Sequence, residues 1–166
     1  MGSIYVMRHG KSDWSSPGAS DHERPLKKRG RDAARRVGRF LTRIGEAPQL
    51  VIVSSAVRAR TTGEIAYEAG GWEAELRVVP ELYEASTGAV AEIIRNVSDE
   101  VERILTVGHQ PTCSIFVSEL IGGGAPAFPT ATIARVDLHL GSWGSLRPNS
   151  GELKWLINPR LLEAAE

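Results

Sequence analysis

The chain has 166 residues, of which 42% are hydrophobic and 24% are charged, and this balance is typical of one globular domain with a full core. The single cysteine, Cys113, excludes an internal disulfide and a zinc site made of several cysteines. The sequence has no apolar run of about 18 residues and no basic and apolar leader, so we expect a cytoplasmic protein of one domain, residues 1–166, that does not enter a membrane.

The formal net charge of zero hides an uneven distribution of charge along the chain. Residues 1–60 contain 13 Lys or Arg and 5 Asp or Glu, whereas residues 61–166 contain 7 and 15. This balance argues weakly against general nucleic-acid binding, and we expect no nucleic acid as a partner.

Three short apolar runs end at residues that can bind an anion. Such a run, followed by glycine or polar residues, predicts a buried strand, and in an open α/β sheet ligands bind beyond the carboxyl ends of the strands. The three ends carry two arginines and two histidines: Arg8 and His9 after residues 4–7, Arg58 after residues 50–53, and His109 after residues 104–107. This combination suits a doubly negative phosphoryl group, and it predicts a phosphatase with a histidine nucleophile.

The segment after the first run is polar and contains Pro and Gly, which predicts a loop over the crevice. The hydroxyl of Ser15 is a candidate donor to phosphate oxygens, although serine is more often an ordinary loop residue. Trp14 is expected to pack as a lid. His22 has two interpretations that stay open: a hydrogen-bonded loop residue, which is the commoner case, or a contact to substrate at the rim.

Residues 28–44 have apolar side chains at helical spacing, which predicts an amphipathic helix. Its opposite face carries Arg35, Arg36, Arg39 and Arg43. Such a face is usually just solvated. It can instead dock an acidic partner, because a basic surface raises the rate of association with acidic proteins.

The rest of the chain continues the alternation of helices and strands. Helices are expected within residues 54–70, 89–94 and 112–121, and strands over 76–79, 131–140 and 151–157. Residues 158–166 are expected to form either a short closing helix or a frayed end. Arg58 is expected near the start of the helix within 54–70, where free backbone N–H groups favour an anion. Pro111 is expected in the first turn of the helix 112–121.

Two glutamates follow the strand at 76–79. Expelling an alkoxide from a phosphate ester needs a proton donor, so Glu81 and Glu84 are candidate general acids, with Glu84 the better one. The alternative is that both are solvated loop residues. Cys113 lies in an apolar helix and is interpreted as a small core residue.

Five segments together resemble the histidine phosphatase (phosphoglycerate mutase-like) superfamily: RHGKSDW, DHERPLKKRG, SSAVRARTT, ELYEA and GHQPT, in this order. DHERPL and the short chain resemble its SixA-like phosphohistidine phosphatase branch. The resemblance spans about residues 4–130. It implies a three-layer α/β/α sandwich around a mainly parallel sheet with one or more antiparallel edge strands, without a metal or a diffusible cofactor.

The resemblance also implies roles for individual residues. His9 resembles the nucleophile that takes the phosphoryl group, while Arg8, Arg58 and His109 resemble the rest of the phosphate pocket. Glu84 matches the position of the family's general acid, in the sequence Leu-Tyr-Glu.

Three functions stay open. The favoured one is hydrolysis of phosphohistidine in a protein, because the short chain has little room for an insertion that would cap the site. The second is a small-molecule phosphomonoesterase that uses Glu84, and the third is a non-catalytic phosphate-binding module. We expect a phosphorylated substrate as the partner and a monomer.

Overall fold

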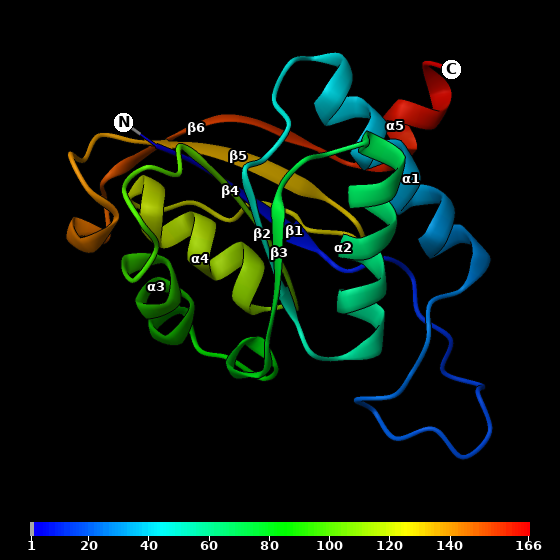
Figure 1. Cartoon of the computed structure of the whole chain (residues 1–166). Coiled ribbons are helices and arrows are strands. Elements are labelled where there is room, and N and C mark those ends of the chain that lie inside the picture. The colour runs from blue at the N-terminus through cyan, green and yellow to red at the C-terminus, as the bar shows by residue number, and fades with distance from the viewer. Residues whose placement is uncertain (1) are drawn as a thin grey trace.

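The structure is a computed structural model that describes residues 2–166, and it consists of one sheet with helices on both faces (Figure 1). The strands are β1 (Ser3–Arg8), β2 (Leu50–Ser54), β3 (Glu75–Val79), β4 (Arg103–Gly108), β5 (Ile133–Leu138) and β6 (Gly151–Ile157). The helices are α1 (Lys28–Arg43), α2 (Val57–Gly70), α3 (Thr87–Arg95), α4 (Thr112–Ile121) and α5 (Pro159–Ala164), with short 3-10 turns at η1 (Pro80–Leu82) and η2 (Trp143–Ser145). The elements predicted from hydrophobic spacing are all present.

The six strands pair in the order β3-β2-β4-β1-β5-β6. The pairs β1–β4, β2–β4 and β2–β3 are parallel, whereas β5 pairs antiparallel with both β1 and β6. The predicted three-layer fold with a mainly parallel sheet is therefore confirmed. The antiparallel end of the sheet is built by β5 and β6, and β6 forms the edge while β5 lies inside.

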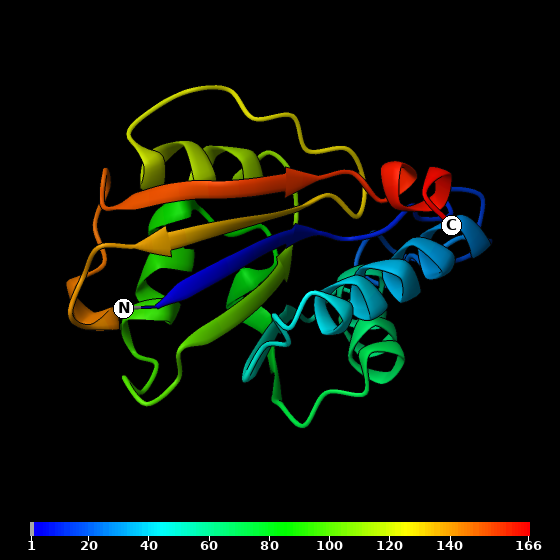
Figure 2. The ribbon, with the colours of Figure 1, turned by 90° about the horizontal axis from the view of Figure 1, so that it is seen from above.

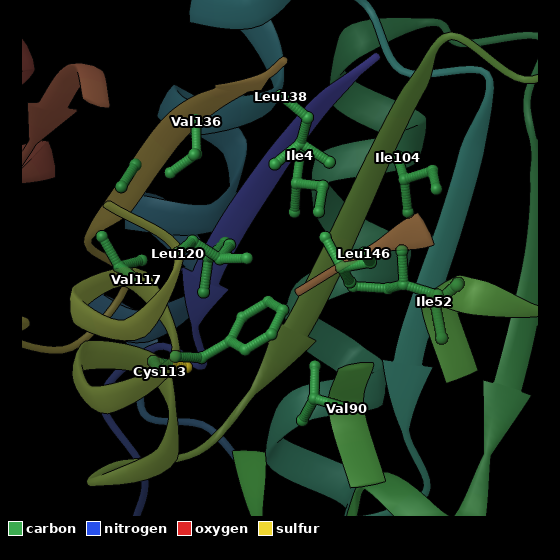
Figure 3. Packing of buried hydrophobic residues seen from close by; sticks show 14 of the residues in the cluster. Ile4, Ile52, Val90, Ile104, Cys113, Val117, Leu120, Val136, Leu138 and Leu146 are labelled. Carbon is green, nitrogen blue, oxygen red and sulfur yellow. The ribbon is translucent and has the colours of Figure 1, made fainter. Parts of the chain in front are cut away.

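Alternate side chains of β1 enter two separate cores. Ile4 and Val6 join the cluster beneath α3 and α4, while Tyr5 and Met7 join the cluster beneath α1 and α2. Figure 3 shows the first cluster, where Val117 of α4 lies over the strands. Because successive side chains of a strand point to opposite faces, a strand covered by helices on both sides must be apolar throughout, as residues 4–7 are.

Local capping explains where the structure departs from the predicted helix ends. α3 begins at Thr87, because the hydroxyl of Ser86 accepts a hydrogen bond from the backbone N–H of Ala89. The apolar pattern starts only at Ala89, so spacing alone missed this first turn. Pro111 is the residue before α4 rather than part of its first turn.

The beginning of α1 lies directly against the loop that follows β1. A Cβ atom on Gly30 would stand 2.3 Å from the backbone oxygen of Lys11, and one on Gly10 would stand 2.7 Å from the backbone oxygen of Gly30. These contacts need residues without side chains, and they fix the loop after β1 in place. Within residues 2–166, no helix has the length and apolar character needed to cross a membrane.

We expect Gly30→Ala to lower the free energy of unfolding by about 1–3 kcal/mol, because the added methyl group must push α1 away from the loop after β1. Urea unfolding at pH 7 measures this change. Gly88→Ala is the matched control: Gly88 also lies in the first turn of a helix, but a Cβ there meets nothing closer than 3.8 Å. A loss at Gly30 no larger than that at Gly88 would contradict the close approach.

Candidate active site

His9 and His109, the two histidines that follow apolar runs in the sequence, lie side by side at the carboxyl ends of β1 and β4. Arg8 is paired in register with Gly108, and the backbone N–H of His9 donates to the oxygen of Gly108 at 3.0 Å. This register places the His9 and His109 rings with their centroids 5.4 Å apart. The chain leaves β1 toward α1 on one face of the sheet and leaves β4 toward α4 on the other (Figure 1). The two histidines therefore lie at the kind of position where open α/β sheets bind ligands.

The His9 ring is buried, and its protonation pattern is set by its own loop. Nδ1 lies 2.7 Å from the backbone oxygen of Gly10. A carbonyl oxygen can only accept, so Nδ1 carries the proton and Nε2 keeps its lone pair. Gly10 is held in turn, because its N–H donates to Thr62 Oγ1 at 3.0 Å.

Three arginines with buried Nε atoms lie around the two histidines: Arg24 and Arg58 are buried, and Arg8 is half-buried. Arg8 ends β1 and donates from Nη1 to the backbone oxygen of Phe128 at 2.9 Å. Arg58, in the first turn of α2, is 6% exposed, and Arg24, in the loop 9–27, is 7% exposed. The Nε–H group of each of the three is buried and meets no acceptor within residues 2–166. An unmet buried donor is unfavourable by about 1–3 kcal/mol, so three of them together indicate a site for a multiply charged oxyanion.

One carboxylate connects the predicted and the unpredicted parts of the site. Asp21 Oδ2 accepts hydrogen bonds from Arg58 Nη2 at 3.2 Å and from the hydroxyl of Tyr83 at 2.5 Å, and Oδ1 accepts from Arg24 Nη2 at 3.0 Å. The hydrogen bond from Tyr83, and then that from Arg24, hold the pKa of Asp21 well below its usual range. Asp21 stays ionised and ties its loop to α2 and to the segment after η1.

Sequence patterns missed Asp21, Arg24 and Tyr83 as parts of the site. Asp21 and Arg24 have the i, i+3 spacing of a local ion pair, which is a signal that the sequence does contain. The contacts from Asp21 to Arg58 and Tyr83 span 37 and 62 residues, and no local spacing predicts them.

His109 is oriented by the end of β2. Its Nε2 lies 2.8 Å from the hydroxyl of Ser54, a residue that is fully buried, and the Tyr83 ring stands edge-on to the imidazole with the centroids 5.7 Å apart. Burial, and then the charge of Arg58, lower the pKa of His109 to about 4. Burial also lowers the pKa of His9, to about 3, and His109, Arg58 and Arg8 add to this effect. Both imidazoles are therefore neutral at pH 7.

The remaining predicted residues lie around the rim or outside it. Ser15 is exposed, and its hydroxyl donates to Asp13 Oδ1 at 2.7 Å, within its own loop. His22 is half-buried: its Nε2 lies 2.9 Å from the hydroxyl of Ser55, and its ring packs edge-on against Tyr83. The structure thus joins His22 to the site through Tyr83, while Ser15 is occupied by Asp13.

Two further expectations have different outcomes. Trp14 is not packed as a lid: 75% of the residue is exposed, and its ring covers the guanidinium of Arg24 at 3.5 Å from the ring centroid. Its polar neighbours in the loop offer no apolar surface for it to bury. Cys113 is a buried residue of the core, as predicted, and burial raises the pKa of its thiol to about 12.

Glu84 stands next to Tyr83 on the exposed surface and adopts φ +56°. This left-handed conformation is uncommon for a residue other than glycine. Within residues 2–166, no group of three His, Cys, Asp or Glu side chains is placed to hold a metal ion.

The family model described as histidine phosphatase superfamily (branch 1) matches residues 4–100, which hold Arg8, His9, Arg24 and Arg58. This chain belongs to the histidine phosphatase superfamily. The predicted resemblance is therefore confirmed.

The chain is similar to SixA proteins and to uncharacterized proteins over nearly its whole length. The phosphohistidine phosphatase SixA of Escherichia coli is 30% identical over 166 residues, covering 98% of each chain. A solved structure of the protein histidine phosphatase SixA with tungstate has a TM-score of 0.83 and 29% identity, covering 96% of this chain and 99% of that one. An uncharacterized protein of Mycobacterium tuberculosis is 36% identical over 164 residues, covering 93% of this chain and all of its own.

The lowered pKa values of this histidine phosphatase make its stability depend on pH. The unfolded chain binds a proton at His9 with the ordinary pKa of 6.5, whereas the folded chain binds it only near 3. The unfolded state therefore takes up more protons as the pH falls below 6.5, and stability is lost from there toward pH 3. Between pH 7 and pH 5, His9 alone accounts for a loss of about 2 kcal/mol in the free energy of unfolding.

Urea unfolding of the wild type and of His9→Asn at both pH values measures this contribution. We expect the loss between pH 7 and pH 5 to be smaller in the variant by about 2 kcal/mol, because asparagine does not titrate. An equal loss in the two proteins would show that His9 is not held neutral by the fold.

Proposed function

We propose that this chain is a phosphohistidine phosphatase that removes the phosphoryl group from a histidine in a protein by way of a covalent phospho-His9 intermediate. The observation that carries this proposal is the hydrogen bond from Nδ1 of His9 to the Gly10 oxygen, which leaves Nε2 unprotonated on a ring that feels the charges of Arg58 and Arg8. The likeness to SixA over nearly the whole chain supports the choice of substrate. The bound tungstate of that SixA structure is a tetrahedral oxyanion, as phosphate is.

In the first step, the lone pair of His9 Nε2 attacks phosphorus. A bond from Nε2 to phosphorus forms, the bond from phosphorus to the substrate imidazole breaks, and the departing nitrogen takes a proton from solvent water. In the second step, water attacks phosphorus on phospho-His9, the bond from Nε2 to phosphorus breaks, and inorganic phosphate leaves after returning a proton to solvent. Arg8 and Arg58 stabilise the charge on the equatorial oxygens, and such preset charges usually make the largest contribution to this chemistry.

The low pKa of free His9 suits this cycle. A proton on Nε2 would block attack, and burial of the ring, with the charges of Arg58 and Arg8 nearby, lowers the pKa of His9 and disfavours that proton. When a phosphoryl dianion enters, its charge offsets the cations and restores basicity to the imidazole. The nucleophile is therefore unprotonated before substrate arrives and more reactive once it is bound.

A small-molecule phosphomonoesterase is the second candidate, and Glu84 is the feature that favours it. An uncommon backbone conformation persists where the surroundings impose it, and such residues gather at functional sites. Glu84 directly follows Tyr83, whose hydroxyl donates to Asp21, so its backbone lies at the rim of the same site. An alkoxide needs such a proton donor more than an imidazole does.

The covalent intermediate gives the most direct test. After brief exposure to a phosphohistidine peptide, we expect the intact mass of the wild type to show one acid-labile phosphoryl adduct. His9→Ala should form none and should release phosphate at least about a thousandfold more slowly, since the nucleophile is lost. His139→Ala, in which an exposed histidine is removed, is the matched control and should keep the adduct. Absence of both adduct and phosphate release in the wild type would leave a phosphate-binding module.

Glu84→Gln separates the two substrate classes. If the chain is an esterase, the variant should hydrolyse alkyl phosphates about 100-fold more slowly or worse, because a general acid contributes at least this much. For a phosphohistidine phosphatase we expect little change in kcat/KM for a phosphohistidine peptide. Measuring both substrates with each protein decides between them: a large loss on the peptide would count against the proposed function.

A further inference from the structure

A polar groove of about 580 Å³ lies between α1, α5 and residues 129–130. Figure 2 shows α5 alongside the first half of α1, near the loop after β1. Four cationic side chains line the groove, Lys11, Arg29, Arg36 and Arg160, together with two carboxylates, Asp32 and Glu163.

The positive charge of the groove is largely uncompensated. Lys11, Arg29 and Arg160 form no ion pair within residues 2–166. Arg36 is paired with Glu166, and Asp32 is already paired with Lys28 and Arg35, which stand outside the groove. Three free cations in one concave surface leave room for the carboxylates of another molecule.

The groove shares its walls with the segments that hold His9. Lys11 comes two residues after His9. On the other side, Thr130 precedes Ala131, whose N–H donates to the backbone oxygen of His9 at 2.9 Å, and Pro129 follows Phe128, whose oxygen accepts from Arg8. The groove therefore borders both of the segments that hold His9 and Arg8 in place.

We propose that the groove binds acidic side chains of the phosphorylated protein substrate, an inference that rests on the proposed function. The free cations extend from Lys11 to Arg160, with Asp32 and Glu163 among them, and this spread fits carboxylates that are spaced along a chain better than one compact anion. The lining is mostly charged and polar, whereas sites for small organic ligands are mostly apolar. Charges at the edge of an interface favour partners of opposite sign and disfavour those of like sign.

The test uses three synthetic phosphohistidine peptides whose flanking residues are glutamate, glutamine or lysine. At about 50 mM salt, where screening is weak, we expect the wild type to have a KM for the glutamate peptide about fivefold below that for the glutamine peptide, with similar kcat. The lysine peptide should bind more weakly than both. The preference should fade at about 0.5 M salt.

The double variant Arg29→Glu/Arg160→Glu should reverse the order of the KM values, with the lowest KM for the lysine peptide and the highest for the glutamate peptide. For each protein, the KM values of these two peptides are compared with its KM for the glutamine peptide. Arg39→Glu/Arg43→Glu is the matched control, because it makes the same change in net charge at exposed residues of α1 outside the groove. The control should keep the wild-type order. An equal loss of the preference for the glutamate peptide in both variants would show that this preference comes from the overall charge of the protein. The groove proposal would then be wrong.

The outcomes for the wild type separate the two proposals. If it hydrolyses all three peptides with the same KM, the groove proposal is wrong while the proposed function stands. If it hydrolyses none of them, the proposed function fails and the groove proposal fails with it.

Discussion

The arrangement on which the rest of the site depends is a cluster of three guanidinium groups beside two imidazoles, in which Arg24 and Arg58 are buried and Arg8 is half-buried. Asp21 pairs with Arg24 and Arg58, while Arg8 forms no ion pair within residues 2–166 and donates to a backbone oxygen instead. Buried like charges are unfavourable unless an anion joins them, so the folded chain is built to receive negative charge. Burial and the same cations also keep His9 unprotonated. One electrostatic arrangement thus sets both the preference for an oxyanion and the state of the imidazole that meets it.

The fold produces this arrangement through backbone register. β4 lies between β1 and β2, and the chain leaves β4 toward the face opposite to that of α1 and α2, so the carboxyl ends open onto a crevice rather than onto a helix. Because Gly10 and Gly30 have no side chains, the backbone of α1 lies in direct contact with the backbone of the loop after β1. Thr62 of α2 accepts from Gly10 N–H and donates to the backbone oxygen of Arg58, which links the loop of His9 to the helix that carries Arg58. The loop of His9 is therefore held from two helices at once.

The sequence predicted the parts of this molecule that follow a local rule. Apolar runs located the strands, and the polar residues immediately after them, Arg8, His9 and His109, meet at one edge because parallel neighbours end together. Asp21 and Tyr83 follow no such rule: their contacts join a loop to distant elements, and only the folded chain brings them together. The tautomer of His9 could not be predicted from the sequence either, because it depends on the direction of the Gly10 carbonyl group. Trp14 shows the opposite error, since an aromatic residue suggested packing where the surroundings are polar.

The way in which Asp21 is bound explains how the pocket can hold its cations in place and still be ready for a substrate. Both Nη atoms of Arg58 donate hydrogen bonds to Asp21, one to its backbone oxygen and one to its carboxylate. The Nη atoms of Arg24 donate to the hydroxyl of Ser12 and to the carboxylate of Asp21. Within residues 2–166, the Nε–H of each of these two arginines meets no acceptor. A phosphoryl group that meets these donors does not have to break the ion pairs that orient them, so the donors need no rearrangement when charge develops on the oxygens. Donors fixed in this way favour the transition state, because the reorganisation that water would require has already been accomplished by folding.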